Sequence, residues 1–154
     1  MKNHLKMSFK KANFSDIEFL WYLRNQPDIY KYAKNSRPIS WKEHINWILP
    51  IVLGTSNKNL FIIKNLKTHI GQVRFDWLKN EQAEVSVSIL KEFQGKGFAT
   101  KALFLAIKEI RKQKKAKIIA EIHKNNVASI KLFEKLNFKF KTKKEVWLKY
   151  IYGN

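Results

Sequence analysis

The residues with the clearest chemical meaning are two glycines that stand between a strand pattern and a helix pattern. Val85 to Leu90 is typical of a strand, and Gly95 and Gly97 follow it at the start of a helical run. Glycine adopts backbone conformations closed to other residues, so successive N–H groups can converge on an anion at a helix N-terminus, where the dipole favours negative charge. This segment therefore predicts a binding loop for a phosphate or pyrophosphate.

The spacing of these glycines excludes two common phosphate loops. A Walker loop ends in Gly-Lys-Ser/Thr, and a dinucleotide fingerprint has three glycines with an acidic residue about 20 positions later. Gln94 to Ala99 instead follows the pattern Gln/Arg-x-x-Gly-x-Gly/Ala. This pattern resembles the cofactor motif of the GNAT superfamily of acetyl-coenzyme A-dependent N-acetyltransferases.

A second segment strengthens this resemblance. Glu121 to Phe138 reads as a strand, then Asn126, then a helix that ends in Leu-Phe-Glu-Lys-Leu-Asn-Phe. It resembles the second GNAT signature, in which an Asn precedes a helix that ends in Leu-Tyr/Phe-Glu-Lys-x-Gly-Phe. The two motifs occur in the order and at the spacing of the family.

The resemblance implies how acetyl-coenzyme A binds as co-substrate. In this superfamily two central parallel strands splay apart, the pantetheine arm lies between them, and the glycine loop holds the pyrophosphate with backbone amides. Lys96 and Lys101 are either cations near the pyrophosphate or ordinary solvated lysines, and Asn126 either bonds the pantetheine or caps its helix. The implied cofactor-binding residues are Val87, Ser88, Ile89, Leu90, Gln94, Gly95, Lys96, Gly97, Phe98, Ala99, Thr100, Asn126 and Phe133.

Acetyl transfer to an amine requires a neutral amine, a polarised thioester carbonyl and a stabilised leaving thiolate. Glu121 and Glu84 are the competing candidates for the base, and His123 is a third because its intrinsic pKa lies near neutrality. The alternative interpretation of each of these three residues is an ordinary strand residue that is solvated or hydrogen-bonded.

The family's usual proton donor is a Tyr at the position that Phe133 occupies here. Phenylalanine cannot donate a proton. Another group or water then protonates the thiolate, or the thiolate leaves unaided. Tyr150 and Tyr152 are the substitutes that the sequence offers.

The N-terminal third is expected to determine the acceptor. Trp21 to Ile29 and Ile39 to Ile48 resemble segments of acetyltransferases that act on nucleotide-linked amino sugars of the pseudaminic acid type, and also of ribosomal-protein acetyltransferases. Aromatic rings can stack on a base or sugar, and arginines can pair with phosphates, although the tryptophans also suit a core. The expected substrate residues are Arg24, Trp47 and Arg74.

These observations predict an N-acetyltransferase that acts on the amino group of a UDP- or dTDP-linked deoxy amino sugar in surface glycan biosynthesis. Two alternatives stay open. One is acetylation of a protein N-terminus, and the other is a GNAT-like module that binds acetyl-coenzyme A without turnover, which the Phe133 position suggests.

The sequence also predicts the strands and helices that position these residues. Strands are expected over 4–10, 59–64, 70–78, 83–90, 116–123, 138–140 and 146–152, with a final turn at 142–144. Helices are expected over 16–25, capped by Ser15-Asp16, over 41–49, capped by Ser40, after the glycine loop, and over 127–136. The prediction is one α/β domain over residues 1–154, with a mixed, mostly antiparallel sheet of about seven strands, a splayed parallel pair and about four helices.

Composition sets limits on the remaining classes. The 154 residues are 45% hydrophobic and include no cysteine, which excludes a disulfide scaffold and a thiol nucleophile, and no metal is expected. The net charge of +19 favours an anionic ligand, but the lysines are spread over the chain, so we do not expect nucleic acid as the partner. No stretch suits a membrane span or a signal peptide, which favours a cytoplasmic protein, and a homodimer stays open.

Overall fold

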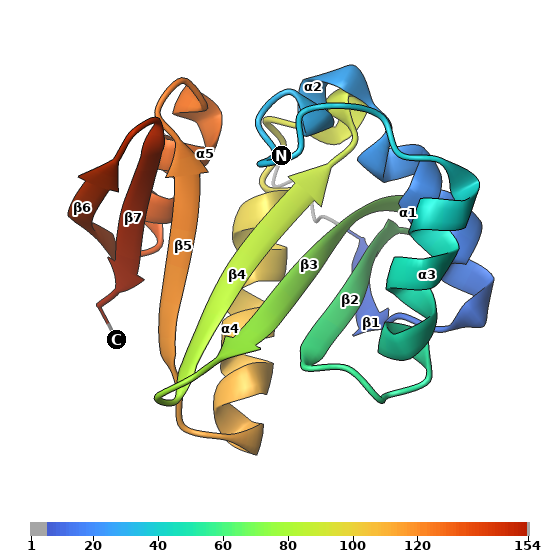
Figure 1. Ribbon diagram of the computed structural model, residues 1–154, viewed down its shortest axis with the longest axis horizontal. Coiled ribbons are helices and arrows are strands. Elements are labelled where there is room, and N and C mark those ends of the chain that lie inside the picture. The colour runs from blue at the N-terminus through green and yellow to red at the C-terminus, as the bar shows by residue number, and fades with distance from the viewer. Residues whose placement is uncertain (1–5, 154) are drawn as a thin grey trace.

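The computed structural model describes residues 6–153. A seven-stranded sheet runs through its centre in the order β1-β2-β3-β4-β5-β7-β6 (Figure 1). All neighbouring strands are antiparallel except β4 and β5. The strands are β1 (Met7–Lys11), β2 (Lys58–Asn65), β3 (Thr68–Leu78), β4 (Gln82–Ile89), β5 (Lys117–His123), β6 (Phe138–Lys144) and β7 (Trp147–Tyr152). This confirms the predicted mixed sheet with one parallel pair.

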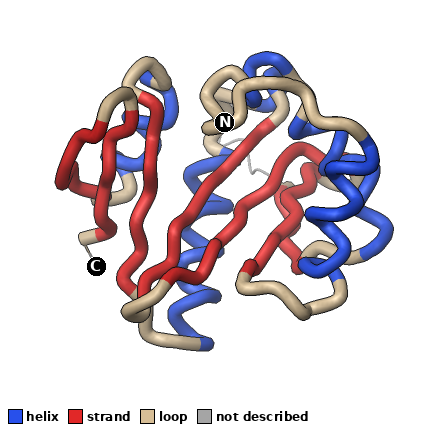
Figure 2. The backbone as a smooth tube through the Cα atoms, in the orientation of Figure 1, coloured by secondary structure: helices blue, strands red, loops and turns tan. Residues whose placement is uncertain are grey.

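Five helices cover the sheet: α1 (Ile17–Arg24), α2 (Pro27–Tyr30), α3 (Trp41–Val52), α4 (Phe98–Gln113) and α5 (Val127–Lys135). Figures 1 and 2 show α1 and α3 on one face, in front of β2 and β3, and α4 on the opposite face. None of the helices described over residues 6–153 has the length and apolarity that a membrane crossing requires.

The two layers of helices create two cores, one on each face. In β2 the four residues Leu60 to Ile63 are all buried, because Leu60 and Ile62 pack with α1 and α3 while Phe61 and Ile63 join the α4 core. Side chains of a strand alternate between faces, so a continuous apolar run is what a strand covered on both faces requires. The larger core fixes β4 against α4 and so positions the glycine loop between them.

The start of α1 differs from the prediction. Asn13, and not Ser15 or Asp16, caps the 3₁₀ turn Phe14–Asp16, because its side chain accepts from the N–H of Ser15 while Asp16 accepts from the N–H of Asn13. Asp16 is fully buried and also accepts from Lys10 Nζ (2.7 Å) and His69 Nε2 (2.8 Å). Three donors therefore hold this carboxylate, and its pKa is lowered by these hydrogen bonds despite the opposing effect of burial.

The ends of other helices and strands also differ from the predicted ones. The first strand begins at Met7, and the predicted start at His4 lies outside the described residues. Pro27 opens α2, which makes five helices where about four were expected. The predicted turn at 142–144 is wrong: β6 continues to Lys144, and Glu145, with φ of 56°, forms the turn with Val146. The sequence did not reveal this because β6 has no apolar residue after Phe140 and is exposed there.

Candidate active site

The site is built on an interruption in the sheet. β4 pairs with β5 only where Gln82, Ala83 and Glu84 face Lys117, Ile118 and Ile119. Beyond Glu84 the two strands diverge, as the two arrows do in Figure 1, while β4 stays paired with β3 as far as Ile89. Backbone groups on the β5 side of Val85 to Ile89 therefore have no strand partner. A free strand edge of this kind can bond an extended ligand as another strand would.

A cavity of about 640 Å³ lies at this divergence. It is lined by the end of β4, the glycine loop, the first turn of α4, the segment 125–135 and the segment 28–32. Of the residues expected at the cofactor, it brings together Val87, Ser88, Ile89, Gln94, Gly95, Gly97, Phe98, Ala99, Thr100 and Asn126.

The glycine loop has the conformation that an anion site needs. Gly95 and Gly97 have φ values of 73° and 89°, in the left-handed region that favours glycine. Gly97 is the N-cap of α4 and has no side chain to bond the first N–H groups of this 16-residue helix. These donors and the positive end of the helix dipole are therefore available to a phosphate. Gln94 Nε2 fixes the loop by donating to the carbonyl oxygen of Ile89 (2.8 Å).

Asn126 serves as a helix cap, one of the two roles considered for it. Its Oδ1 accepts from the N–H of Ser129 at 3.3 Å, at the start of α5. The same residue lines the cavity, so its amide nitrogen can still meet a ligand.

Three predicted cofactor residues do not line the cavity. The N–H of Leu90, directly after the end of β4, donates to the carbonyl oxygen of Ile70 in β3 at 2.8 Å. Lys96 Nζ lies over the ring of Phe93, 5.7 Å from its centroid, and Phe133 is 3% exposed and packs edge-on against Phe138. The cations that line the cavity are instead Lys31, Lys91, Lys131 and Lys135, and Lys101 is not among them.

A second cavity, of about 370 Å³, adjoins the first. It brings together Arg24 of α1, Trp47 of α3 and Arg74 of β3, the three residues expected at the acceptor. Ile29 and Ser88 line both cavities. The two cavities are therefore neighbours at these two residues.

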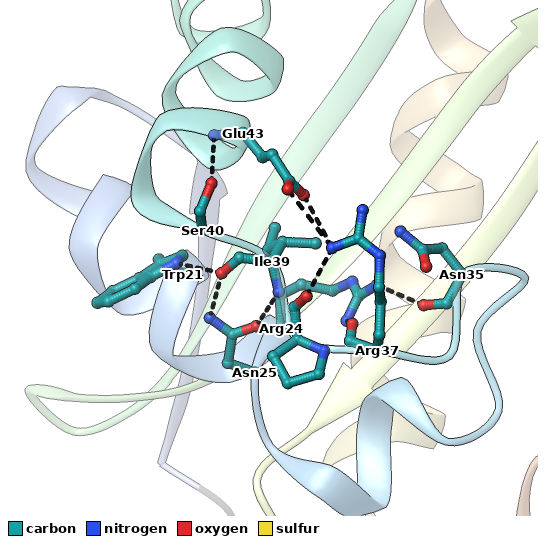
Figure 3. Close-up of polar contacts among 9 residues, drawn as sticks. Trp21, Arg24, Asn25, Asn35, Arg37, Ile39, Ser40 and Glu43 are labelled. Atoms are coloured by element: carbon teal, nitrogen blue, oxygen red, sulfur yellow. Dashed lines mark hydrogen bonds and ion pairs between the residues drawn. The ribbon is translucent and has the colours of Figure 1, made fainter.

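Two guanidinium groups, of Arg24 and Arg74, and one carboxylate, of Glu43, line the second cavity. Arg24 donates to the backbone oxygens of Asn35 (2.7 Å) and Arg37 (3.1 Å), and pairs with no carboxylate among the described residues (Figure 3). Burial, followed by repulsion from Arg37 and Arg74, lowers the pKa of the Arg24 guanidinium. Arg74 bonds Asp76 at 2.8 Å and lies 5.3 Å from the ring centroid of Trp47. An anion in this cavity would relieve the repulsion between the guanidinium groups.

The two candidate bases differ in their surroundings. Glu121 forms an ion pair with Lys34, whose pKa this hydrogen bond raises. Glu84 has no hydrogen bond or ion pair among residues 6–153, and burial, followed by repulsion from Glu121, raises its pKa. Neither carboxylate lines either cavity. Glu84 does lie on the same face of β4 as Ser86 and Ser88, and Ser86 Oγ is buried without a hydrogen-bond partner in the part of the chain that the structure describes.

The candidate proton donors differ in whether they lie at a cavity. Tyr150 OH donates to Glu134 (3.1 Å), burial raises its pKa, and neither Tyr150 nor Tyr152 lines a cavity. Tyr32 does line the first cavity, where its ring lies 5.6 Å from that of His123. Tyr32 is not predicted as a site residue from the sequence, because nothing in the segment 27–38 indicates that it folds over strands 50 to 90 residues away.

The comparisons with known proteins agree with this geometry. Residues 7–139 match the family model described as an acetyltransferase (GNAT) domain. The chain belongs to the GNAT acetyltransferase family. As a member of this family, the GNAT domain uses acetyl-coenzyme A as its co-substrate. Among residues 6–153, no group of three or more metal-ligating side chains is brought together.

A curated relative is an uncharacterized protein of Methanocaldococcus jannaschii, 32% identical over 145 residues. The match covers 90% of this chain, but the chain spans only 29% of that protein's length. A crystal structure of a domain from the same organism superposes with a TM-score of 0.83 at 29% identity, covering 95% of this chain and 97% of that one.

Two more distant structures share the fold of the GNAT domain. The spermidine N-acetyltransferase of Vibrio cholerae, solved with coenzyme A and spermine, has a TM-score of 0.80 at 19% identity, with 96% and 94% of the two chains covered. An acetyltransferase of Salmonella typhimurium that modifies the N-terminal serine of ribosomal protein L7/L12 has a TM-score of 0.81 at 13% identity, with 96% and 95% covered. Such likenesses concern the fold alone, and these proteins act on different acceptors.

Proposed function

We propose that this GNAT domain, spanning residues 1–154, moves the acetyl group of acetyl-coenzyme A to the primary amine of a nucleotide-linked deoxy amino sugar in surface glycan biosynthesis. One observation carries the proposal: a cavity with two guanidinium groups and an indole ring joins the cofactor cavity at Ile29 and Ser88. Guanidinium groups pair with phosphates in two-pronged hydrogen bonds, and an indole face stacks on a sugar or base. The cytoplasmic location expected from the sequence stays a prediction.

In this proposal the free edge of β4 from Val87 to Ile89 bonds the pantetheine arm. The N–H groups at Gly97 and the start of α4 bond the pyrophosphate. The thioester then lies near Ser88, where the second cavity begins, and the acceptor amine enters from the side of Arg24 and Arg74. Holding the two reacting groups together supplies much of the acceleration in such a transfer.

Glu84 is the base that the surroundings favour. One oxygen of Glu121 is already engaged by Lys34. Glu84 has no ion pair within residues 6–153, and its raised pKa brings it closer to the pH at which it must accept a proton. Ser86 Oγ, without a protein partner, can bond a water that links Glu84 to the amine. Tyr32 supplies the proton that the leaving thiolate takes up.

The test is acetyl transfer measured by mass spectrometry. The protein is incubated with acetyl-coenzyme A and, in separate mixtures, UDP- and dTDP-linked amino sugars, the free amino sugars, short peptides with a free N-terminus, and spermidine. We expect a gain of one acetyl group on a nucleotide-linked sugar. Transfer only to a peptide or to spermidine would refute the sugar acceptor, and cofactor binding without transfer to any amine would favour a binding module.

An arginine variant then connects the acceptor to the second cavity. Arg24→Ala should raise the KM for the sugar nucleotide while the KM for acetyl-coenzyme A changes little. Arg111→Ala is the matched control, because Arg111 is an exposed residue of α4 that lies outside both cavities. Equal effects of the two variants would contradict a phosphate site at Arg24.

A further inference from the structure

The α5 side of the cofactor cavity carries positive charge that the proposed binding of pantetheine and pyrophosphate does not use. Lys131 and Lys135 both line the cavity, and their spacing of four residues places them on one face of α5. Neither ammonium group forms an ion pair within residues 6–153. Among the described residues, Asp28 is the only acidic one that lines the cavity, and it accepts a hydrogen bond from Gln94 (3.1 Å).

The two helix starts at the cavity differ in how they can meet an anion. At α4, Gly97 leaves the first N–H groups free. At α5, Asn126 already occupies the N–H of Ser129. An anion at α4 is therefore bound by the backbone, whereas an anion at α5 must be bound mainly by side chains, and Lys131 and Lys135 are the cations present there.

Coenzyme A carries two separate anionic groups, the pyrophosphate and the 3′-phosphate of its ribose. The glycine loop can surround only one of them. Figure 1 shows the loop before α4 and the helix α5 on opposite sides of the gap between β4 and β5, so a second anionic group of the same ligand can reach α5.

We propose that Lys131 and Lys135 bind the 3′-phosphate of coenzyme A and make the domain prefer coenzyme A over 3′-dephospho-coenzyme A. This inference rests on the proposed cofactor binding and adds a specificity site to it. Lys131 and Lys135 are both exposed, so their hydrogen bonds to a phosphate are screened by water and together change affinity about tenfold. Loss of the 3′-phosphate should therefore weaken binding by about that factor.

The experiment is a titration calorimetry series with the two ligands and three proteins. Wild type should bind coenzyme A about tenfold more tightly than 3′-dephospho-coenzyme A. The double variant Lys131→Ala/Lys135→Ala should bind the two ligands equally, at the wild-type affinity for the dephosphorylated one. The control is Lys108→Ala/Lys112→Ala, which removes the same charge at the same spacing from exposed positions of α4 away from the cavity, and it should keep the preference.

The outcomes separate this inference from the proposed function. Equal binding of both ligands by wild type, or an equal loss of preference in the control variant, would overturn the 3′-phosphate site and leave cofactor binding intact. A parallel loss of affinity for both ligands in the double variant would overturn it as well, because the lysines would then act on the whole ligand. If wild type binds neither ligand, the proposed cofactor site itself fails.

Discussion

Glu84 combines burial and an acidic neighbour with the lack of a direct ion pair within residues 6–153, and this combination leads to a kinetic prediction. Glu84→Gln should lower kcat by roughly 100-fold while coenzyme A affinity stays near wild type, because the variant removes a proton acceptor and no cofactor contact. In wild type, activity should fall as pH drops through the raised pKa of Glu84, since only the ionised carboxylate accepts a proton. Rate profiles of both proteins against pH measure this, and Glu121→Gln is the comparison variant.

The same residue gives a stability prediction that does not depend on activity. Folding raises the pKa of Glu84, so the folded protein resists its ionisation, and the resulting loss of stability appears as pH rises through the folded pKa. Glu84→Gln should therefore raise the Tm at neutral pH and change it less in acid, where the wild-type carboxyl is already neutral. A Tm lowered at neutral pH would show that Glu84 makes stabilising contacts instead.

Tyr32 is the tyrosine that the fold places at the cofactor cavity, whereas Phe133 lies in the core. If its hydroxyl protonates the leaving thiolate, Tyr32→Phe should lower kcat by about 100-fold with little change in cofactor affinity, because the ring stays and only the donor is lost. Tyr30→Phe, two residues away and outside both cavities, is the control. Unchanged turnover in Tyr32→Phe would leave water as the proton source.

At the scale of elements, the glycine loop and α4 act together, since the loop conformation exposes the first N–H groups of the helix. Gly97→Val should greatly weaken coenzyme A binding, because a β-branched residue disfavours the φ of 89° that the loop requires. Gly54→Val is the matched control: Gly54 has a φ of 75°, has open space around it and lies outside both cavities. Both variants should lose about 1–2 kcal/mol of stability from backbone strain, but only the first should lose calorimetric affinity.

For the molecule as a whole, the net charge of +19 and the two adjoining cavities predict stabilisation by anionic ligands. Coenzyme A at 100 times its Kd should add about 2.7 kcal/mol to the free energy of unfolding, or roughly 5 to 10 °C in Tm for a domain of this size. Added salt should reduce this shift because it screens the attraction of the lysines. A thermal melt without a shift under saturating coenzyme A would argue against the cofactor cavity.

Local signals in the sequence determined those parts of this protein whose conformation depends on residues close together in the chain. Ser40 caps α3 as predicted, with its Oγ accepting from the N–H of Glu43, and the apolar spacing of Ala102, Leu103 and Ala106 gives the buried face of α4. The glycines of the cofactor loop also belong to this class, because the ability to adopt a positive φ without steric cost is a property of glycine itself.

Only the tertiary structure decided which residues from distant segments meet. On α5, Leu132 and Lys131 line the cavity while Phe133 joins the core. Successive side chains of a helix differ in direction by about 100°, and the packing of α5 against the sheet determines which of them faces the core. Tyr32 reaches the cavity because the segment after α1 crosses the splayed strands, a contact between residues too far apart in the chain for any periodic pattern to register. The spacing of residues along the chain thus determined the cofactor loop, whereas long-range packing determined what surrounds it.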